Sequence, residues 1–234
     1  MTRLPTLAGV ATSSRRLDAP TPTNGRDRPN SRGDATRLRI LLKAEELFAQ
    51  HGIAAVPLRD IGIAAGQKNN VAVQYHFRDR DTLVREIASY RAVVGEAVRS
   101  EMLAGLLASG RPVTVRGLVQ AYVASLTCHL EPGDHYLAFL ARYTAERGSF
   151  AGLEGLSTST IYTFTAMLRR LLPDLPEAIL EERWNVMMTS ALHTVARYQA
   201  AQRLGNLPAP LPQLTDDLVS YFAAALAAPS EVPS

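Results

Sequence analysis

From residue 34 onward the chain carries apolar side chains at steps of three and four residues, the spacing that places them on one face of an α-helix. The first segment with this pattern reads DATRLRILLKAEELFAQHG. Asp34 can cap its start, and Gly52 can adopt the left-handed conformation that ends a helix. The pattern predicts an all-α protein that begins with a helix of about four turns. The apolar face of this helix comprises Ile40, Leu41, Ala44, Leu47 and Phe48.

Turn-forming segments divide the rest of the chain into further helices. Gly66 follows a short helix in LRDIGIAAG, and Pro57 before it is compatible with a first-turn position. Asn69 is a good N-cap for a third helix, which should run to about Tyr75, and Asp79 can cap a long fourth helix. Later breaks fall at SGRP, EPGD, RGSFAG, PDLP and GNLPAPLP. The remaining predicted helices span 80–108, 113–130, 134–147, 155–172, 177–204 and 213–227.

The second and third predicted helices are short and are joined by a turn that contains Gly66. They follow a longer helix that can cover their apolar faces. These are the ingredients of a helix-turn-helix. Asn70 and Gln74 lie four residues apart, so their amide groups share a face and can bond base edges, while Val71 and Ala72 can approach thymine methyl groups. A short polar helix at the protein surface that does not contact DNA bases explains the same residues equally well.

Residues 1–33 differ from the rest in composition. They hold six arginines and two aspartates, a surplus of +4, in a chain whose total charge is +3. The segment is rich in Pro, Thr, Ser and Asn and has no helical or strand period, which predicts a disordered basic tail. Such a tail is either a plain leader or a basic arm that adds phosphate contacts to a neighbouring nucleic-acid module.

Composition narrows the class of protein further. Cys128 is the only cysteine, so no intrachain disulfide can form. Aromatic residues make up only 6% of the chain, which argues against an aromatic-rich β-sandwich. No apolar run approaches the roughly 20 residues that cross a bilayer, and the N-terminus does not have the order of a secretory signal. A cytoplasmic protein is therefore expected.

Residues 35–87, ATRLRILLKAEELFAQHGIAAVPLRDIGIAAGQKNNVAVQYHFRDRDTLVREI, resemble the DNA-binding domain of the tetracycline-repressor (TetR) family of transcriptional regulators. The order and spacing of LLKAEELFAQHG, LRDIGIAAG, YHF and RDRDTLVREI carry the resemblance. It implies a helix-turn-helix DNA-binding domain at 34–80, a helical-bundle effector-binding and dimerisation domain at 81–228, and a disordered tail at 229–234.

The resemblance assigns DNA contacts by position. Arg59 stands early in the second helix, where relatives often contact DNA, and the third helix is the one that reads bases. The pair Tyr75 and His76 and the basic residues that follow it reach phosphates in relatives. The chain departs from the family at Pro57, where many relatives have Thr or Ser, and has one residue more than the commonest pattern before Tyr75. The predicted DNA contacts are Arg59, Asn69, Asn70, Val71, Ala72, Gln74, Tyr75, His76, Arg78 and Arg80.

The resemblance also implies a homodimer that represses from a palindromic operator on double-stranded DNA and is released by a small-molecule effector, with no cofactor and no metal. In such a family the middle helices surround the effector cavity and the last two form the dimer seam. The predicted cavity residues are Tyr122, Cys128, His129, Tyr136, Phe139, Tyr143, Phe164 and Met167. The predicted seam residues are Trp184, Met188, Ala191, Leu192, Val195, Leu214, Leu218, Tyr221 and Phe222.

Other interpretations of the same residues stay open. Apolar side chains at helical spacing also fit the core of an ordinary monomer. Tyr75 and Phe77 could likewise be core plugs between helices, and we favour that assignment for Phe77. Cys128 beside His129 could suggest a thiol nucleophile, but neighbours on a helix point about 100° apart, and no oxyanion site or orienting acid is visible. The five histidines show no metal-ligand spacing. A helical protein-interaction module would bind DNA weakly and without sequence preference.

Overall fold

The computed structural model describes residues 31–67, 71–153 and 159–230, and this part of the chain is all-α, as predicted. The predicted tail up to residue 30, together with Asn69, Asn70 and residues 231–234, lies outside the described residues. Residues 31–33, which were also predicted to belong to the disordered tail, instead form the start of the first helix. Asp34 does not cap the first helix but lies inside its first turn. The helices are α1 (Ser31–His51), α2 (Leu58–Ala64), α3 (Ala72–Phe77), α4 (Arg80–Ala108), α5 (Val115–Thr127), α6 (Tyr136–Arg147), α7 (Ser159–Leu171), α8 (Glu177–Arg203) and α9 (Leu211–Ala227).

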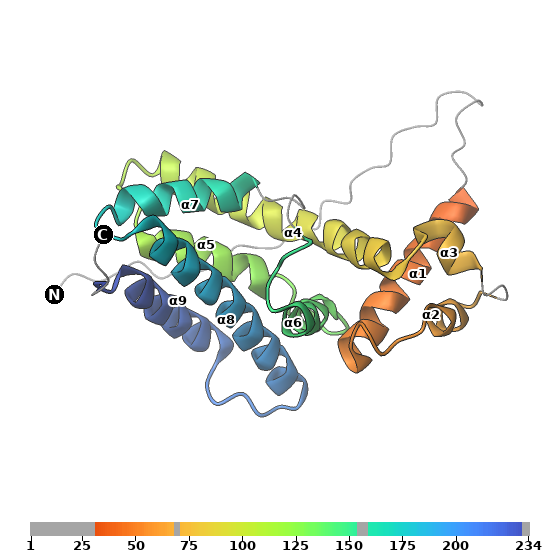
Figure 1. Cartoon of the computed structure of the whole chain (residues 1–234). Coiled ribbons are helices and arrows are strands. Elements are labelled where there is room, and N and C mark those ends of the chain that lie inside the picture. Colours follow the sequence, from red (N-terminus) through yellow and green to blue (C-terminus); the bar gives the residue numbers. More distant parts are fainter. Residues whose placement is uncertain (1–30, 68–70, 154–158, 231–234) are drawn as a thin grey trace, which may run out of the picture.

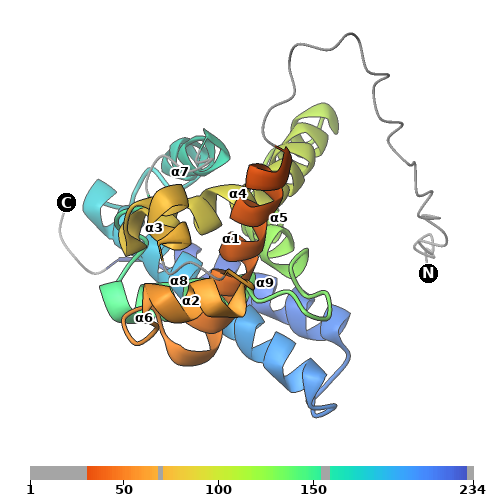
Figure 2. The same cartoon turned by 90° about the vertical axis from the view of Figure 1, so that its right-hand side faces the viewer.

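The described helices gather at the two ends of an elongated molecule (Figure 1). At one end α1, α2 and α3 form a small unit, which we call the head, and at the other end α5, α7, α8 and α9 lie together. The long helix α4 runs from the head to the far group, and α6 lies between them, against α1 and α8. In Figure 2 the head faces the viewer, with α2 and α3 in front. Helices α4 and α6 are therefore the main connections between the head and the C-terminal domain.

The third helix begins later than predicted. Its N-cap is Val71 rather than Asn69, and the helix runs from Ala72 to Phe77. Val73 and Phe77 are buried in the core of the head. The two side chains lie four residues apart on one face, and burying each contributes roughly 1.5 to 3 kcal/mol, which anchors α3 on the head. The assignment of Phe77 to the core is confirmed.

Helix α5 is the centre of the C-terminal domain. Its buried residues occur on all sides, and α4, α7, α8 and α9 pack around it. The side chain of Thr114 accepts a hydrogen bond from the backbone nitrogen of Gly117 at 3.1 Å, which caps its start. A helix that is apolar over most of its circumference must be covered on all sides. In α5 the chain itself supplies that cover.

The end of α6 is hydrogen-bonded to the turn that follows α1. The carboxylate of Glu146 accepts from the backbone nitrogens of Ile53 at 2.7 Å and Ala54 at 3.1 Å. Gly52 ends α1 in left-handed backbone with φ of 90°, as predicted. A Cβ atom at this position would lie 2.9 Å from Glu146 Oε1, so the glycine also makes room for the carboxylate. This contact fixes the head against α6.

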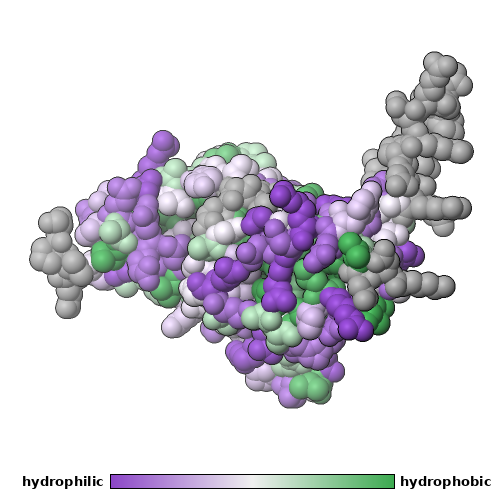
Figure 3. All heavy atoms as spheres, turned by 45° about the vertical axis from the view of Figure 1, so that its right-hand side comes forward, coloured by the Kyte–Doolittle hydropathy of each residue, from purple (hydrophilic) through white to green (hydrophobic). Residues whose placement is uncertain are grey.

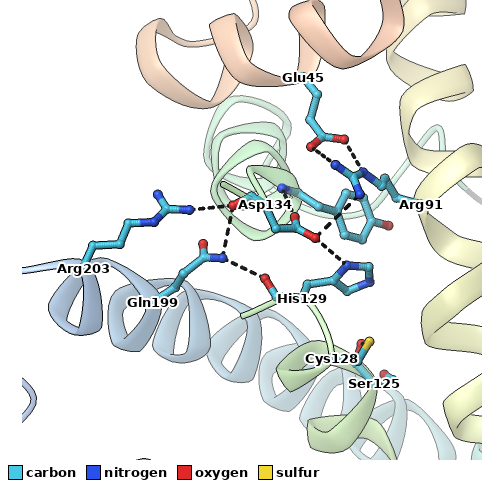
Figure 4. A network of polar contacts seen from close by, with 9 residues as sticks. Glu45, Arg91, Ser125, Cys128, His129, Asp134, Gln199 and Arg203 are labelled. Carbon is cyan, nitrogen blue, oxygen red and sulfur yellow. Dashed lines mark hydrogen bonds and ion pairs between the residues drawn. The ribbon is translucent and has the colours of Figure 1, made fainter. Parts of the chain in front are cut away.

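A chain of buried polar contacts makes the second connection between the domains (Figure 4). Glu45 of α1 is 1% exposed, and its two oxygens accept from Arg91 of α4 at 2.6 and 2.7 Å. Arg91 Nη1 lies 3.6 Å from Asp134 Oδ2 in the α5–α6 connection. The same oxygen lies 3.2 Å from His129 Nδ1, just beyond α5. Three segments that are distant in sequence, α1, α4 and the α5–α6 connection, therefore meet through one set of charges.

Helix α8 holds the backbone of this connection in place. Gln199 Nε2 donates to the carbonyl oxygens of His129 at 2.7 Å and Asp134 at 3.1 Å. Arg203 Nη2 donates to the same carbonyl of Asp134 at 2.6 Å. The Asp134 side chain also accepts from the backbone nitrogen of Tyr136 at 2.8 Å, at the start of α6. These bonds set the direction of the Asp134 carboxylate.

The pair His129 and Asp134 is ionised. Burial lowers the pKa of His129, but the hydrogen bond to Asp134 and the neighbouring Cys128 outweigh burial and raise this pKa to about 9. Burial raises the pKa of Asp134, but hydrogen bonds from His129 and from the nitrogen of Tyr136, with the charge of Arg91, hold it below its ordinary value. Both shifts stabilise the folded state when both groups carry charge.

This ion pair predicts a loss of stability at alkaline pH. The contribution of His129 is fully present below its unfolded-state pKa of about 6.5 and is lost as the pH rises through about 9. The wild-type free energy of unfolding should therefore fall between these pH values by roughly 1 to 3 kcal/mol more than that of a His129→Gln variant, as measured by urea denaturation. His51→Gln, at an exposed histidine that ends α1, is the control. Equal slopes for wild type and His129→Gln would contradict the assignment.

Candidate DNA-binding face and ligand cavity

Helix α3 has one buried and one exposed side. Val73 and Phe77 face the core, whereas Gln74 is exposed and Tyr75 is 81% exposed. Helix α3 lies in the part of the head that faces the viewer in Figure 2. The exposure of Tyr75 overturns the alternative that this residue is a core plug. A short helix that offers an amide and a phenol at an exposed end can contact nucleic acid.

Neighbouring residues extend the exposed face of α3. Arg59 of α2 and Arg78 after α3 are exposed, and so are the apolar side chains of Ile63 and Val71. Hydrophilic side chains cover most of the face shown in Figure 3, and hydrophobic ones reach the surface toward the head. Ala72 is half-buried and packs against the core. A mixture of cations, amides and small apolar groups suits phosphates and base edges together.

Arg78 and His76, two of the residues predicted to contact phosphates, lie at the turn between α3 and α4 and at the end of α3. Arg78 has φ of 62° and ψ of −64°, and the nitrogen of Asp79 donates to the carbonyl of Phe77 at 2.6 Å across it. This is a γ-turn, which is rare and strained for a residue with a side chain. His76 is half-buried, and its ring meets that of Tyr75 edge-on at 5.1 Å. The tight turn directs the chain straight from α3 into α4.

Arg80 occupies a different place from the one that the resemblance implied. Its two terminal nitrogens donate to the carbonyl oxygens of Ala54 and Val56, each at 2.9 Å. Its Nε is buried and has no hydrogen-bond partner among the described residues. The guanidinium therefore holds the α1–α2 connection against the start of α4. We leave Arg80 out of the proposed DNA contacts for this reason.

A cavity of about 1000 Å³ lies in the C-terminal domain, between helices α4 to α8. This volume is at the upper end of the range for small-molecule sites. Three of the predicted cavity residues line it: Tyr122, His129 and Tyr136. Burial raises the pKa of both tyrosines, so both hydroxyls are protonated at neutral pH.

The other five predicted cavity residues are not among the lining residues. Phe139 and Phe164 are fully buried in the core. The hydroxyl of Tyr143 donates to the carbonyl of Ala151. The remaining two are Cys128, whose Sγ donates to the carbonyl of Ser125, and Met167, which packs against the core.

The polar lining of the cavity was missed by sequence reasoning. Arg99 of α4 donates to Thr160 Oγ1 at 2.9 Å and Ser125 Oγ at 3.0 Å, and forms an ion pair with Glu96 at 2.8 Å. Burial raises the pKa of Glu96, but hydrogen bonds from Ser159, Thr160 and Arg99 more than reverse this and lower it. A Glu and an Arg three residues apart in α4 were visible in the sequence. Nothing in the sequence showed that α5 and α7 would enclose them.

Most of the predicted seam residues are not exposed in a single chain. Six of the nine are buried within the chain's own core. Trp184 and Met188 line the cavity, whereas Leu218 and Phe222 line a groove between α8 and α9. Tyr221 is the exception, with 66% of its surface exposed. An apolar groove of about 350 Å³ runs between α8 and α9 beside Tyr221 and Val186. The six buried residues are Trp184, Ala191, Leu192, Val195, Leu218 and Phe222.

Two further properties concern the described residues alone. None of their helices combines the length and apolar character that a membrane span requires. Within the same ranges, no three or more His, Cys, Asp or Glu side chains gather as metal ligands would.

The chain matches two family descriptions. Residues 40–87 match "Bacterial regulatory proteins, tetR family", and residues 116–225 match "Tetracyclin repressor-like, C-terminal domain". The first match covers most of the head and part of α4, and the second covers most of the C-terminal domain. No curated protein sequence gives a match.

Solved structures share the fold. One is a TetR family transcription regulator from Marinobacter aquaeolei VT8, with 16% identity over 84% of this chain and 98% of that chain, and a TM-score of 0.57. Another is the TetR-like regulator LfrR from Mycobacterium smegmatis in complex with proflavine, with 18% identity over 82% and 96% of the two chains, and a TM-score of 0.50. With an exposed helix-turn-helix and both family matches in the expected order, the chain belongs to the tetracycline-repressor family of DNA-binding transcriptional regulators.

Proposed function

We propose that this protein is a cytoplasmic repressor that binds a palindromic operator as a homodimer and is released by a small organic effector. The observation that carries the proposal is the exposed side of α3, where Gln74 and Tyr75 stand away from the buried Val73 and Phe77. A recognition helix needs this division, because one side must pack on the head while the other enters a major groove.

The exposed residues of the head divide into two roles. Gln74 has an amide that can pair with adenine N6 and N7, and Val71 offers an apolar contact for a thymine methyl group. Arg59, Tyr75 and Arg78 surround them and supply phosphate contacts, which set the register of the head on the duplex. His76 lies at the end of α3 and completes this set of proposed contacts. Asn69 and Asn70, outside the described residues, remain proposed base contacts.

The effector would bind in the cavity of the C-terminal domain. Support comes from its volume, its aromatic walls and its position between α4 and α6, the two helices that reach the head. The related regulator LfrR was solved with proflavine, a planar organic molecule. An effector that prefers one arrangement of α4 and α6 would shift the population of DNA-binding conformations.

A dimer would place two heads on successive major grooves, about 34 Å apart. The groove between α8 and α9 suits the seam better than the predicted residues that are buried elsewhere in the core. Val186 is 53% exposed and Tyr221 is 66% exposed, and both line the apolar groove between these helices. Two copies packed through this groove would form an isologous contact.

Removing a phosphate contact should change the salt dependence of DNA binding. Arg59→Ala should reduce the slope of log K against log salt concentration by about 1, because one fewer counterion is released. Arg80→Met should leave this slope unchanged but lower the free energy of unfolding by roughly 1 to 3 kcal/mol, because two carbonyls lose their donor. Arg111→Ala, at an exposed arginine between α4 and α5, should change neither quantity. A reduced slope in Arg80→Met would return Arg80 to the phosphate contacts.

Removing a base contact should relax sequence preference at one position of each half-site. Gln74→Ala should lose roughly 1 to 3 kcal/mol of discrimination at that base pair, measured by selecting binding sites from random duplex DNA. Gln67→Ala, at the half-buried glutamine after α2, is the matched control. Identical preferences for wild type and Gln74→Ala would exclude Gln74 as a base-reading residue. Salt-steep binding with no preferred sequence in the wild type would instead identify an interaction module with non-specific DNA affinity.

The revised seam is tested by placing a charge in it. Tyr221→Glu should convert a dimer at micromolar concentration to a monomer, because a desolvated carboxylate without a partner opposes association. Tyr162→Glu is the control, since Tyr162 of α7 has the same exposed fraction of 66%. Analytical ultracentrifugation would distinguish the species. A wild-type monomer, or a Tyr221→Glu dimer as stable as the wild type, would eliminate this seam.

A further inference from the structure

Two buried nitrogen atoms in the cavity wall lack partners. His129 and Trp184 are each 3% exposed and both line the cavity. His129 Nε2 and Trp184 Nε1 are buried and have no hydrogen-bond partner among the described residues. Buried polar atoms are nearly always hydrogen-bonded, because leaving one unpaired is costly. Two such atoms in one cavity therefore indicate where a ligand would bond.

Both atoms are hydrogen-bond donors. An indole nitrogen can only donate. The imidazole of His129 has Nδ1 against the Asp134 carboxylate, 3.2 Å away, and Asp134 holds the ring in its charged form, so Nε2 also carries a proton. Both arginines that line the cavity are already engaged. Arg99 is engaged by Glu96, Ser125 and Thr160, and Arg169 forms ion pairs with Glu177 and Glu181. The matching ligand groups are oxygen acceptors.

The walls beside the two donors are aromatic. The ring of Tyr122 meets that of Trp184 edge-on with centroids 5.7 Å apart, and the ring of Tyr136 meets that of His129 edge-on at 4.7 Å. All four residues line the cavity. Aromatic surfaces favour flat ring systems, which stack or pack edge-on against them.

The same histidine begins the chain of contacts that ends in the head. Its Nδ1 bonds Asp134, Asp134 lies against Arg91, and Arg91 makes two hydrogen bonds to the buried Glu45 of α1 (Figure 4). Glu45 is almost fully buried, so moving its partner would leave a charge unpaired. A ligand that shifts the His129 ring therefore acts on the position of α1 through charged groups.

We propose that the cavity binds a flat aromatic molecule with acceptor oxygens, held by His129 Nε2 and Trp184 Nε1, and that Asp134, Arg91 and Glu45 connect this site to α1. The proposal rests on the proposed function of the cavity as the effector site. It deepens that function by naming the chemical class of the effector and the residues through which it acts on the head.

Calorimetric titration with two three-ring probes tests the chemical class. Anthraquinone-2-carboxylate is flat and carries acceptor oxygens, whereas proflavine has similar dimensions but is a cation that offers donors. The acid should bind one site per chain, at least about tenfold more tightly than proflavine. Saturable binding of proflavine with equal or higher affinity, or no binding of the acid, would overturn the assignment.

Variants test the two donors. His129→Phe and Trp184→Phe should each weaken binding of the acid about tenfold, and His129→Gln, which keeps a donor, should weaken it less. His51→Gln is the control, and circular dichroism checks that each variant is folded. If the acid binds His129→Phe and Trp184→Phe as tightly as the wild type, water satisfies these nitrogens and the proposal fails.

The connection to the head is tested with a neighbouring pair of glutamates. Glu45→Gln should bind the acid as the wild type does, but the acid should no longer change its affinity for the selected DNA site, a change expected to be about tenfold in the wild type. Glu46→Gln, whose carboxylate bonds Lys43 outside the chain of contacts, should behave as the wild type. An unchanged response in Glu45→Gln, or no response in the wild type, would overturn the connection. If the wild type selects no DNA sequence, the proposed function fails, whereas the calorimetry still decides the ligand class.

Discussion

The buried carboxylate of Glu45 is the constraint on which the arrangement of the two domains depends. A charge that is 1% exposed is tolerated only with a well-aligned partner, and the two hydrogen bonds from Arg91 provide one. Because Glu45 belongs to α1 and Arg91 to α4, the head cannot rotate freely about the long helix. Asp134 extends the same charge pairing to the α5–α6 connection.

A second set of contacts acts just beyond the C-terminal end of α1. Glu146 at the end of α6 bonds the turn after α1, and Arg147 pairs with Asp81 in the first turn of α4 at 2.8 Å. Arg80 joins that turn to α4 from the other side. Helix α6 therefore contacts the head and also lines the cavity. A displacement of the cavity wall can reach α1 through this one rigid helix.

The sequence predicted the parts of this protein that depend on local order. Helical spacing, with Gly52 and Asp79 at boundaries, was enough to place the described helices to within a few residues, because burial of one face and a few terminal residues decide where a helix runs. The start of α3 was missed, because its N-cap is Val71 and not Asn69, the better capping residue in the sequence. The family was recognisable because its motifs lie within one continuous segment.

The sequence by itself determined an all-helical chain with a helix-turn-helix near one end, since both follow from the order of neighbouring residues. Only the tertiary structure decided what each apolar face covers. From the sequence alone, Trp184 on its predicted helix fits a dimer interface as well as it fits a cavity wall. The packing of α8 against α5 and α7 places it in the cavity wall. Glu45, Arg91, Asp134 and His129 likewise show no pattern along the chain, because their relation arises from pairing of charges between segments that meet only after folding.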